Sequence, residues 1–530
     1  MIRTLPRSTP ISRLLLAVTI PLALALLLPT VYLAIRAAQV PSGDALSYLT
    51  RAGTLSVIGR SLLLVGAVSL STAAIGIPAA WLTVRTDLRA RRLWTVVLTV
   101  PLVIPSYVFA LALVGALGQR GFVQGWLAPL GVERLPSIYG FWGAWLAITL
   151  LSYPYVFLSV RAGLKGLDPA LEEASRTLGR SSWETFRRIT LRQLMPSITA
   201  GVLLVALYTL SDFGAVAIMQ YNVFTRVIYL RLSLDLSLAA LLSIVLVVLS
   251  VGILVLAHAI EPRGSHYTRR SARVPRRVIL GRWQWAAQAF VALIALGALI
   301  APLGVLSYWL ANGLQHGETL NSVLVPLQRS IRAAALAALA AGALALPFVI
   351  LQVRYPSRLS HALAQGAYLG YALPGVVVGL AFVFLGAKVL GALNQIFGLS
   401  DYRSLGLLVF AYVVRFLPQA IGPARAGLLQ VNPHLEESAL TLGRSRPRVF
   451  LSVTLPLMRP GMIAGIALVF LTAMKELPIT LLLAPTGYTT LTTQIWSASS
   501  EAFYARAAAP ALVLVLISAL SLVYILDSDD

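Results

Sequence analysis

Three charged residues lie inside long apolar segments of this chain, where their chemistry is hardest to explain by a solvated surface. Asp212 lies deep in one apolar run, and Lys475 and Glu476 lie at the equivalent place in another. A charge at the centre of a membrane helix costs about 2.5–3.5 kcal/mol on insertion scales, so it usually faces a protein-lined path or a buried partner. We predict that Asp212 and Glu476 line or gate a translocation path, with Lys475 as a counter-charge. The alternative is a structural role, as a buried pair or a stabiliser of a kink near Gly214 and Pro478.

Other kinds of chemistry find little support in the sequence. The chain has no cysteine, which excludes disulfides, thiolate metal sites and cysteine nucleophiles, and it has only five histidines. It also lacks the G-x-x-x-x-G-K-[ST] loop that holds nucleotide phosphates. A membrane-embedded enzyme would need clustered acid–base or metal-binding residues, and none is evident beyond the two acids. We therefore expect no catalytic residue, no bound metal and no cofactor.

The composition indicates an integral membrane protein. Of the 530 residues, 58% are hydrophobic and 12% are charged, whereas soluble domains carry about 25% charged residues. Apolar runs of about twenty residues recur along the chain, a length that matches the hydrocarbon core of a bilayer. The net charge is +23, but the basic residues stand in short clusters between apolar runs. This distribution fits the positive-inside rule, so we expect a lipid bilayer and no nucleic acid as partner.

The apolar runs predict an all-α polytopic fold with about twelve transmembrane helices in two six-helix halves. The first run is too long for a signal-peptide core of about 7–15 residues, so we expect a retained span. The first six helices are expected near 14–36, 60–84, 95–117, 138–160, 197–220 and 237–259. The second six are expected near 284–310, 331–352, 363–390, 405–424, 461–484 and 507–526.

Alternate loops are rich in arginine, which predicts the orientation of the chain. These loops include Arg85–Arg92, Arg161–Arg192 and Arg425–Arg459, and the rule for positive loops places them and both termini in the cytoplasm. A further basic segment, 261–283, separates a first half, 1–260, from a second half, 284–530. We expect this linker to be a solvated tether facing lipid headgroups.

The two halves contain copies of one segment. Residues 161–196 align without a gap to residues 425–460, at an offset of 264, and 17 of the 36 positions are identical. The identities include Arg, Glu, Pro, Thr and Gly, which chance similarity between apolar segments does not explain. Outside this segment the Ile104-Pro105 turn resembles Leu373-Pro374. Repeats in transporters usually place the substrate path at the interface between the halves.

Each copy predicts a cytoplasmic elbow of two short helices. In the first copy, Asp168 supplies an N-cap before Pro169, and Gly179 ends the helix in the left-handed conformation. Ser181 then caps the second helix, with Glu184 as its capping-box partner. A rigid, duplicated elbow of this kind suits docking to a two-fold partner, although an ordinary capped loop is the simpler alternative.

The second copy repeats most of these signals. Asn432 is the predicted cap, Gly443 the predicted stop, and Ser445 a cap without a capping box. Pro196 and Pro460 close the two copies, and we expect them to mark the return of the chain into the membrane.

The duplicated segment resembles the EAA signature of ABC-importer permeases, which reads Glu-Ala-Ala-x-x-x-Gly, then an aromatic, an aliphatic and Leu-Pro-x-x-x-Pro. The first copy matches through Glu173-Ala174-Ser175, Gly179, Phe186, Ile189, Leu191 and Pro196. The second matches through Glu437-Ser438-Ala439, Gly443, Phe450, Val453, Leu455, Pro456 and Pro460. Each triplet has one small-residue change, and Arg192 replaces the usual proline. The resemblance implies the MetI-like permease fold.

In that family the elbow is a coupling helix that fits a groove on a cytoplasmic ATPase, so the resemblance implies an ATPase dimer as partner. It also implies a soluble binding protein that delivers cargo to the outer face, and an inner-membrane location. The coupling residues that the resemblance implies are Glu172, Glu173, Ala174, Gly179, Arg180, Glu436, Glu437, Ala439, Gly443 and Arg444.

The cargo is suggested by the segments that follow the elbows. Residues 208–216 and 221–229 after the first elbow, and 474–483 and 487–493 after the second, resemble the ferric-iron permeases of this family, which also carry both halves on one chain. We therefore expect a permease subunit that moves ferric iron inward by alternating access. Thiamine or another small solute is the nearest alternative. An ion-coupled secondary transporter would explain twelve spans but not two matched elbows.

Overall fold

The computed structural model describes residues 13–118, 121–132, 134–167, 169–232, 234–260, 277–386 and 404–527. Within these ranges ten helices are long and apolar enough to cross a membrane, and two shorter apolar helices accompany them. The described backbone is helical apart from loops and one isolated bridge between Thr86 and Val278. The prediction of an all-α polytopic protein is confirmed. The Asp168 cap and linker residues 261–276 lie outside the described residues.

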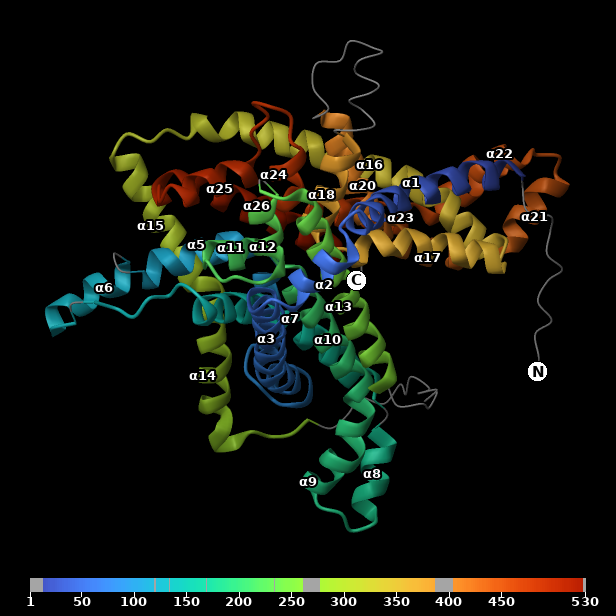
Figure 1. Ribbon diagram of the computed structural model, residues 1–530. Helices are drawn as coiled ribbons and strands as arrows, with labels where there is room; N and C mark the ends of the chain where they lie inside the picture. Colours follow the sequence, from blue (N-terminus) through green and yellow to red (C-terminus); the bar gives the residue numbers. More distant parts are fainter. Residues whose placement is uncertain are drawn as a thin grey trace.

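The halves repeat the same order of helices (Figure 1). The first half contains α1 (Arg13–Ala38), α3 (Ala52–Arg85), α4 (Arg91–Thr99), α5 (Ser106–Leu117), α7 (Phe141–Gly166), α10 (Leu191–Ser211) and α13 (Leu236–Ile260). The second contains α14 (Gln284–Ala295), α15 (Ala301–Gln315), α16 (Asn321–Arg354), α17 (Arg358–Ala372), α18 (Gly375–Leu385), α20 (Leu405–Gln430), α23 (Leu455–Met474) and α26 (Tyr504–Asp527).

Four of the predicted spans are broken helices rather than continuous ones. The third breaks between α4 and α5 at Ile104-Pro105, and the ninth breaks between α17 and α18 at Leu373-Pro374. Proline has no N–H and forces the preceding residue to be extended, and Ile104 and Leu373 have ψ angles of 125° and 132°.

The other two breaks fall at the intramembrane charges. The fifth span breaks at Asp212, between α10 and the short helix α11 (Gly214–Ile218). The eleventh breaks at Lys475-Glu476, between α23 and α24 (Pro478–Leu483). A helix can stop at membrane depth only where its freed backbone groups are buried in protein or line a cavity. The four breaks therefore mark the protein-facing centre of the molecule.

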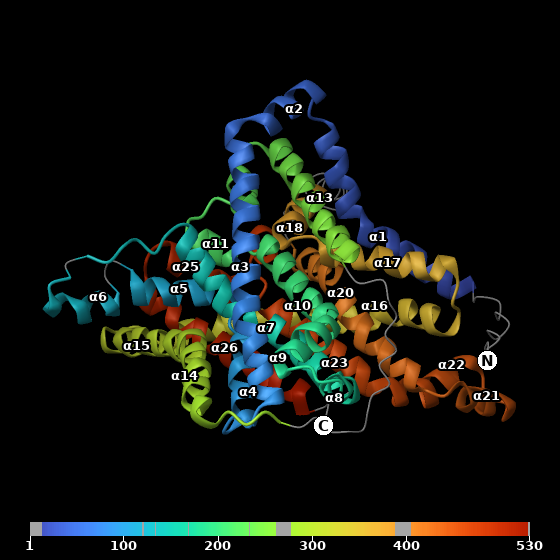
Figure 2. The ribbon, with the colours of Figure 1, turned by 90° about the horizontal axis from the view of Figure 1, so that it is seen from below.

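The first helix of each half crosses to the other half. α1 packs against α13 of its own half and against α17 and α18 of the second half (Figure 2). In the same way, α15 packs against α26 of its own half and α5 of the first half, while α14 packs against α4. The halves are thus interlocked, and neither buries its helices alone.

The chain entering the second half is also pinned to the first half. The Val278 N–H donates to the Arg85 carbonyl at 2.8 Å, and the Asp87 N–H donates to the Val278 carbonyl at 3.2 Å. The Asp87 carboxylate accepts from the Leu280 N–H at 2.9 Å. This short pairing closes the loop after α3 against the segment that precedes α14.

Glycine allows α20 and α23 to cross in backbone contact. A Cβ on Gly461 would stand 2.4 Å from the Pro423 carbonyl oxygen, and one on Gly465 would stand 2.9 Å from the Ala420 carbonyl oxygen. Gly461 and Gly465 are four residues apart, the small-x-x-x-small spacing typical of close membrane-helix pairs.

Gly461→Ile should therefore force α20 and α23 apart and destabilise the protein by about 1–3 kcal/mol or more, as overpacking does in a tight core. The measurement is the apparent Tm of the purified chain in detergent. Gly422→Ile is the matched control, because Gly422 lies on the same helix pair with nothing within 4 Å of its Cβ position. Equal Tm values for the two variants would contradict the close crossing.

Candidate functional site

Each half carries an elbow of two short helices at a tip of the molecule (Figure 1). The first elbow is formed by α8 (Pro169–Thr177) and α9 (Ser182–Thr185), the second by α21 (Pro433–Thr441) and α22 (Arg446–Val449). Gly179 and Gly443 both have a φ of +81°, the left-handed conformation expected at the end of a helix. The Arg180 N–H donates to the Ser175 carbonyl at 3.3 Å, which completes this type of stop. The predicted elbows are confirmed.

The caps of the elbow helices follow the sequence only in part. Asn432 accepts the His434 N–H at 3.0 Å, and Ser181 accepts the Glu184 N–H at 3.2 Å. The predicted capping box is wrong, because the Glu184 carboxylate pairs with Arg188 at 3.2 Å, one turn further along. Ser445 stands at the predicted cap position but makes no side-chain cap bond.

The elbow and the membrane span that follows it are one continuous helix. The described helices run over Ser182–Ser211 and Arg446–Met474, with a π-helical turn just before α10 and before α23. Pro196 and Pro460, expected to mark the return of the chain into the membrane, lie inside these helices and do not break them. A membrane helix tolerates proline because local adjustment satisfies the freed carbonyl. The tip of each elbow is thus joined rigidly to a charged helix break.

A partly buried ion pair anchors each elbow to the helical bundle. Arg85, at the end of α3, is 3% exposed and pairs with Glu172, which also accepts from the Thr190 hydroxyl at 2.8 Å. The second half repeats this triad with Arg354, Glu436 and Thr454, at 3.0 Å and 2.8 Å. Charge-assisted bonds of this kind are stronger than neutral ones.

Glu172 and Glu436, the glutamates of these two ion pairs, are therefore only partly exposed, unlike most of the other expected coupling residues. Ala439 is 8% exposed and lies under its elbow. The expected coupling residues that are exposed are Glu173, Ala174, Gly179, Arg180, Glu437, Gly443 and Arg444.

Two leucines at the elbow tips were missed by the sequence reasoning. Leu178 and Leu442 are 79% and 81% exposed, and each precedes the left-handed glycine. Their signal in the sequence was the pentapeptide Thr-Leu-Gly-Arg-Ser, which is identical in both halves. The two elbows thus present the same exposed apolar residue at equivalent tips.

Both intramembrane acids cap the short helix that follows their break. Asp212 accepts the Ala215 N–H at 3.0 Å and lies within hydrogen-bonding reach of the Ser106 hydroxyl. Glu476 accepts the Ile479 N–H at 3.3 Å. Both side chains are buried, with 6% and 8% exposure. The two acids thus satisfy backbone groups that the breaks leave open.

The cations around the breaks belong to the second half. Arg415 pairs with Glu476 at 2.8 Å, so Arg415 is the counter-charge that was predicted to be Lys475. The Lys475 amine instead donates to the Leu102 carbonyl at 3.2 Å, across the interface between the halves. At the offset of 264, Leu151 replaces Arg415 in the first half.

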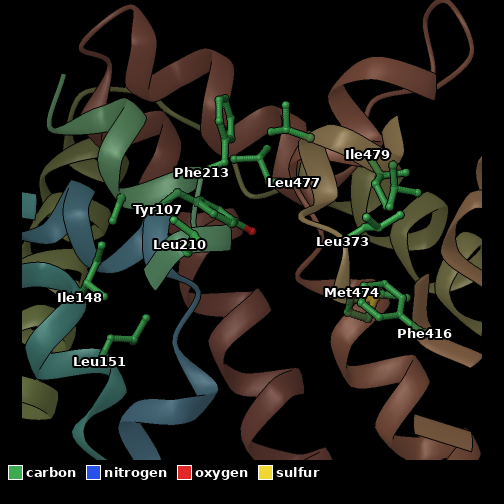
Figure 3. Close-up of a cluster of buried hydrophobic side chains, with 14 of the residues drawn as sticks. Tyr107, Ile148, Leu151, Leu210, Phe213, Leu373, Phe416, Met474, Leu477 and Ile479 are labelled. Atoms are coloured by element: carbon green, nitrogen blue, oxygen red, sulfur yellow. The ribbon is translucent and has the colours of Figure 1, made fainter. Parts of the chain in front are cut away.

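Apolar side chains of both halves fill the space around these charges (Figure 3). Tyr107 of the first half is 2% exposed, and it directs its hydroxyl toward the group from the second half that includes Met474 (Figure 3). That hydroxyl has no hydrogen-bond partner among the described residues. Phe213 packs against Trp496 across the halves, with the rings tilted and their centroids 5.3 Å apart.

Comparison with known proteins accounts for the repeat and the elbows. Residues 72–266 and 334–528 each match the family described as binding-protein-dependent transport system inner membrane component. The chain belongs to this family. It is a non-enzymatic permease subunit that crosses the membrane several times.

Individual relatives of this permease carry different substrate names. It is 33% identical over 523 residues to the Fe(3+)-transport system permease protein FbpB 2 of Haemophilus influenzae, covering 97% of both chains. It is 25% identical to the ferric transport system permease protein FbpB of Actinobacillus pleuropneumoniae, over 87% of this chain and 69% of that protein. The molybdenum transport system permease protein ModB of Escherichia coli is 36% identical over 28% of this chain and 64% of its own length.

Glu172→Gln should loosen the first elbow from the bundle, because it leaves the buried Arg85 without its charged partner. Losing a charged hydrogen-bond partner costs about 1–3 kcal/mol, so α8 amides should exchange hydrogen roughly 5–150 times faster. The measurement is hydrogen exchange of the elbow by mass spectrometry. Glu173→Gln is the control on the exposed neighbour. Equal exchange in both variants would show that the ion pair does not hold the elbow.

Proposed function

We propose that this permease is the membrane subunit of an ATP-driven importer that moves ferric iron into the cytoplasm. The assignment of ferric iron as the cargo rests on the similarity to a named ferric-iron permease over 97% of both chains. The similarity to the molybdenum permease covers only 28% of this chain. A full-length likeness that includes both halves favours iron over molybdate or another small solute.

The partners follow from the two elbows. Leu178 and Leu442 project from equivalent tips, and the sequence has no phosphate-binding loop of its own. A dimer of cytoplasmic ATPases docked on these tips would supply the energy, and a soluble binding protein would deliver cargo on the other side. The elbows then lie in the cytoplasm, as do both termini, and the protein lies in the inner membrane. The halves are 1–260 and 284–530, joined by the basic linker 261–283.

The route for cargo runs between the halves, past Asp212, Lys475 and Glu476. Three features support this placement: the helices break there, the acids are buried there, and Lys475 reaches the Leu102 carbonyl of the other half. Because each break ends the helix that begins at an elbow, a displacement of the tip moves one side of the route directly. Tyr107 and its apolar neighbours are buried between the halves, so they would close such a route. Alternating access would separate them.

Uptake into liposomes tests both the identity of the cargo and the energy source of transport. With the candidate ATPase and binding protein, ferric iron uptake should require ATP and resist competition by thiamine or molybdate. The double variant Leu178→Asp, Leu442→Asp should lower uptake by about tenfold or more, because it buries charge at the docking surface. Leu178→Met, Leu442→Met is the matched control, because it keeps an apolar side chain of similar volume at both tips and should leave uptake near the wild-type rate.

The outcomes separate the parts of this proposal. ATP-dependent uptake of thiamine or molybdate in place of iron would overturn the cargo and keep the importer. Uptake that is indifferent to ATP and to the elbow variant would overturn the importer and favour an ion-coupled transporter.

Lys475→Met should shift the conformational equilibrium of the permease. A hydrogen bond to a charged group contributes about 1.5–3 kcal/mol, so losing it should change the ratio of conformers roughly 10–150-fold. The chain has no cysteine, so Thr177→Cys and Thr441→Cys allow spin labels on the two elbows alone. Pulsed electron resonance between the labels should then show a new distance population.

Ser211→Met is the control for this measurement. Ser211 is the equivalent residue in the first half, and among the described residues its hydroxyl bonds only the Tyr208 carbonyl of its own helix, at 3.0 Å. Its distance distribution should match the wild type. A wild-type distribution in Lys475→Met would refute the role of the contact between the halves.

A further inference from the structure

A pocket of about 600 Å³ lies beside the first elbow. Its walls come from the ends of α3 and α7, from the elbow, from Val278 of the linker and from Phe290 of α14. Most of the lining is apolar, and the polar groups at its base, Arg85 and Glu172, are paired with each other. A pocket of this size and lining suits a hydrocarbon chain better than a hydrated solute.

Aromatic rings form one side of this pocket. Trp81 packs edge-on against Phe186 with centroids 5.0 Å apart, and Trp183 stacks on Phe186 at 5.7 Å. Trp183 is 69% exposed. Tryptophan is enriched at the boundary between a membrane and water, which is where an elbow continuous with a membrane helix must lie. The pocket is therefore open at headgroup level.

A basic hollow adjoins the apolar pocket on the same helix. It is lined by Arg180, Arg187, Arg188 and Arg192 together with Leu191 and Met195. Leu191 borders both the apolar pocket and the basic hollow. Guanidinium groups bind phosphate through paired N–H donors. An apolar pocket and a phosphate-binding surface thus meet at one residue.

We propose that the first elbow binds one anionic phospholipid. Its acyl chain occupies the apolar pocket beside Trp81 and Trp183, and its phosphate lies on the arginine cluster around Arg187. A water-soluble anion would leave the apolar pocket empty, and a zwitterionic lipid would bind the cluster more weakly because the cation of its headgroup offsets the charge of its phosphate. The lipid would cover the base where Arg85 holds the elbow, so it would stabilise one of the two docking tips.

The second elbow lacks this combination of residues. At the offset of 264, Leu451, Ser452 and Pro456 replace Arg187, Arg188 and Arg192, and Pro447 replaces Trp183. At the same offset, Leu14 and Leu26 stand where the first pocket has Val278 and Phe290. The site is therefore expected once in each chain.

Quenching of tryptophan fluorescence tests the proposal on the full purified chain. The probes are phosphatidylglycerol and phosphatidylcholine with the same brominated acyl chains. The signal from the pocket is the difference between the wild type and Trp183→Phe, a variant that keeps an aromatic ring. Phosphatidylglycerol should quench this signal at a concentration about tenfold or more lower than phosphatidylcholine.

Two sets of variants separate the site from general lipid contact. The triple variant Arg187→Gln, Arg188→Gln, Arg192→Gln should remove the preference for phosphatidylglycerol. The matched triple Arg446→Gln, Arg448→Gln, Arg459→Gln on the second elbow should retain it. Circular dichroism and gel filtration check that each variant is folded.

Several results would overturn the proposal. Equal quenching by the two lipids in the wild type would mean that ordinary membrane lipid fills the pocket. A preference that survives the first triple variant would mean that the arginine cluster does not bind the headgroup. Complete displacement of phosphatidylglycerol by millimolar inorganic phosphate would mean that the surface binds free phosphate instead of lipid.

Discussion

The ion pair between a long helix and an elbow is the contact on which the position of each elbow depends. Arg85 ends α3 and Arg354 ends α16, and each holds a glutamate of the adjacent elbow from inside the bundle. The threonine that completes each triad lies on the helix leading from the elbow into the membrane. Three elements are thereby fixed at one point, so a force on the tip reaches the bundle without bending a loop.

The repeat and the elbows could be predicted because their information is local. Helix stops, caps and small residues act over a few positions, and the identity between the halves made the pattern visible. The partners of the charged residues could not be predicted in this way. Arg85 and Glu172 are 87 residues apart, and Lys475 and Leu102 are 373 residues apart. Only the packing of helices brings such residues together, which is why Arg415 was not recognised as the partner of Glu476.

The broken spans show a second limit of the sequence. A sliding measure of hydropathy treats an apolar run as one helix, because Pro105 and Pro374 barely change its mean value. The breaks were indicated instead by the preference of the residue before a proline for an extended backbone, which Ile104 and Leu373 both adopt. Pro196 and Pro460 carried a similar signal and yet lie within helices. A proline alone thus does not decide whether a helix breaks. The difference is whether buried groups can form hydrogen bonds with the backbone groups that a break leaves open.

The charges at the breaks balance only when both halves are present. The first half supplies one carboxylate, Asp212, while the second supplies Glu476 with the two cations Arg415 and Lys475. When all four are ionised, the halves carry −1 and +1 at this level and sum to zero. In a low-dielectric interior an unbalanced charge acts over a long distance. Two identical halves could not carry opposite charges here, so joining different halves in one chain allows a neutral interface whose contact through Lys475 has no symmetric copy.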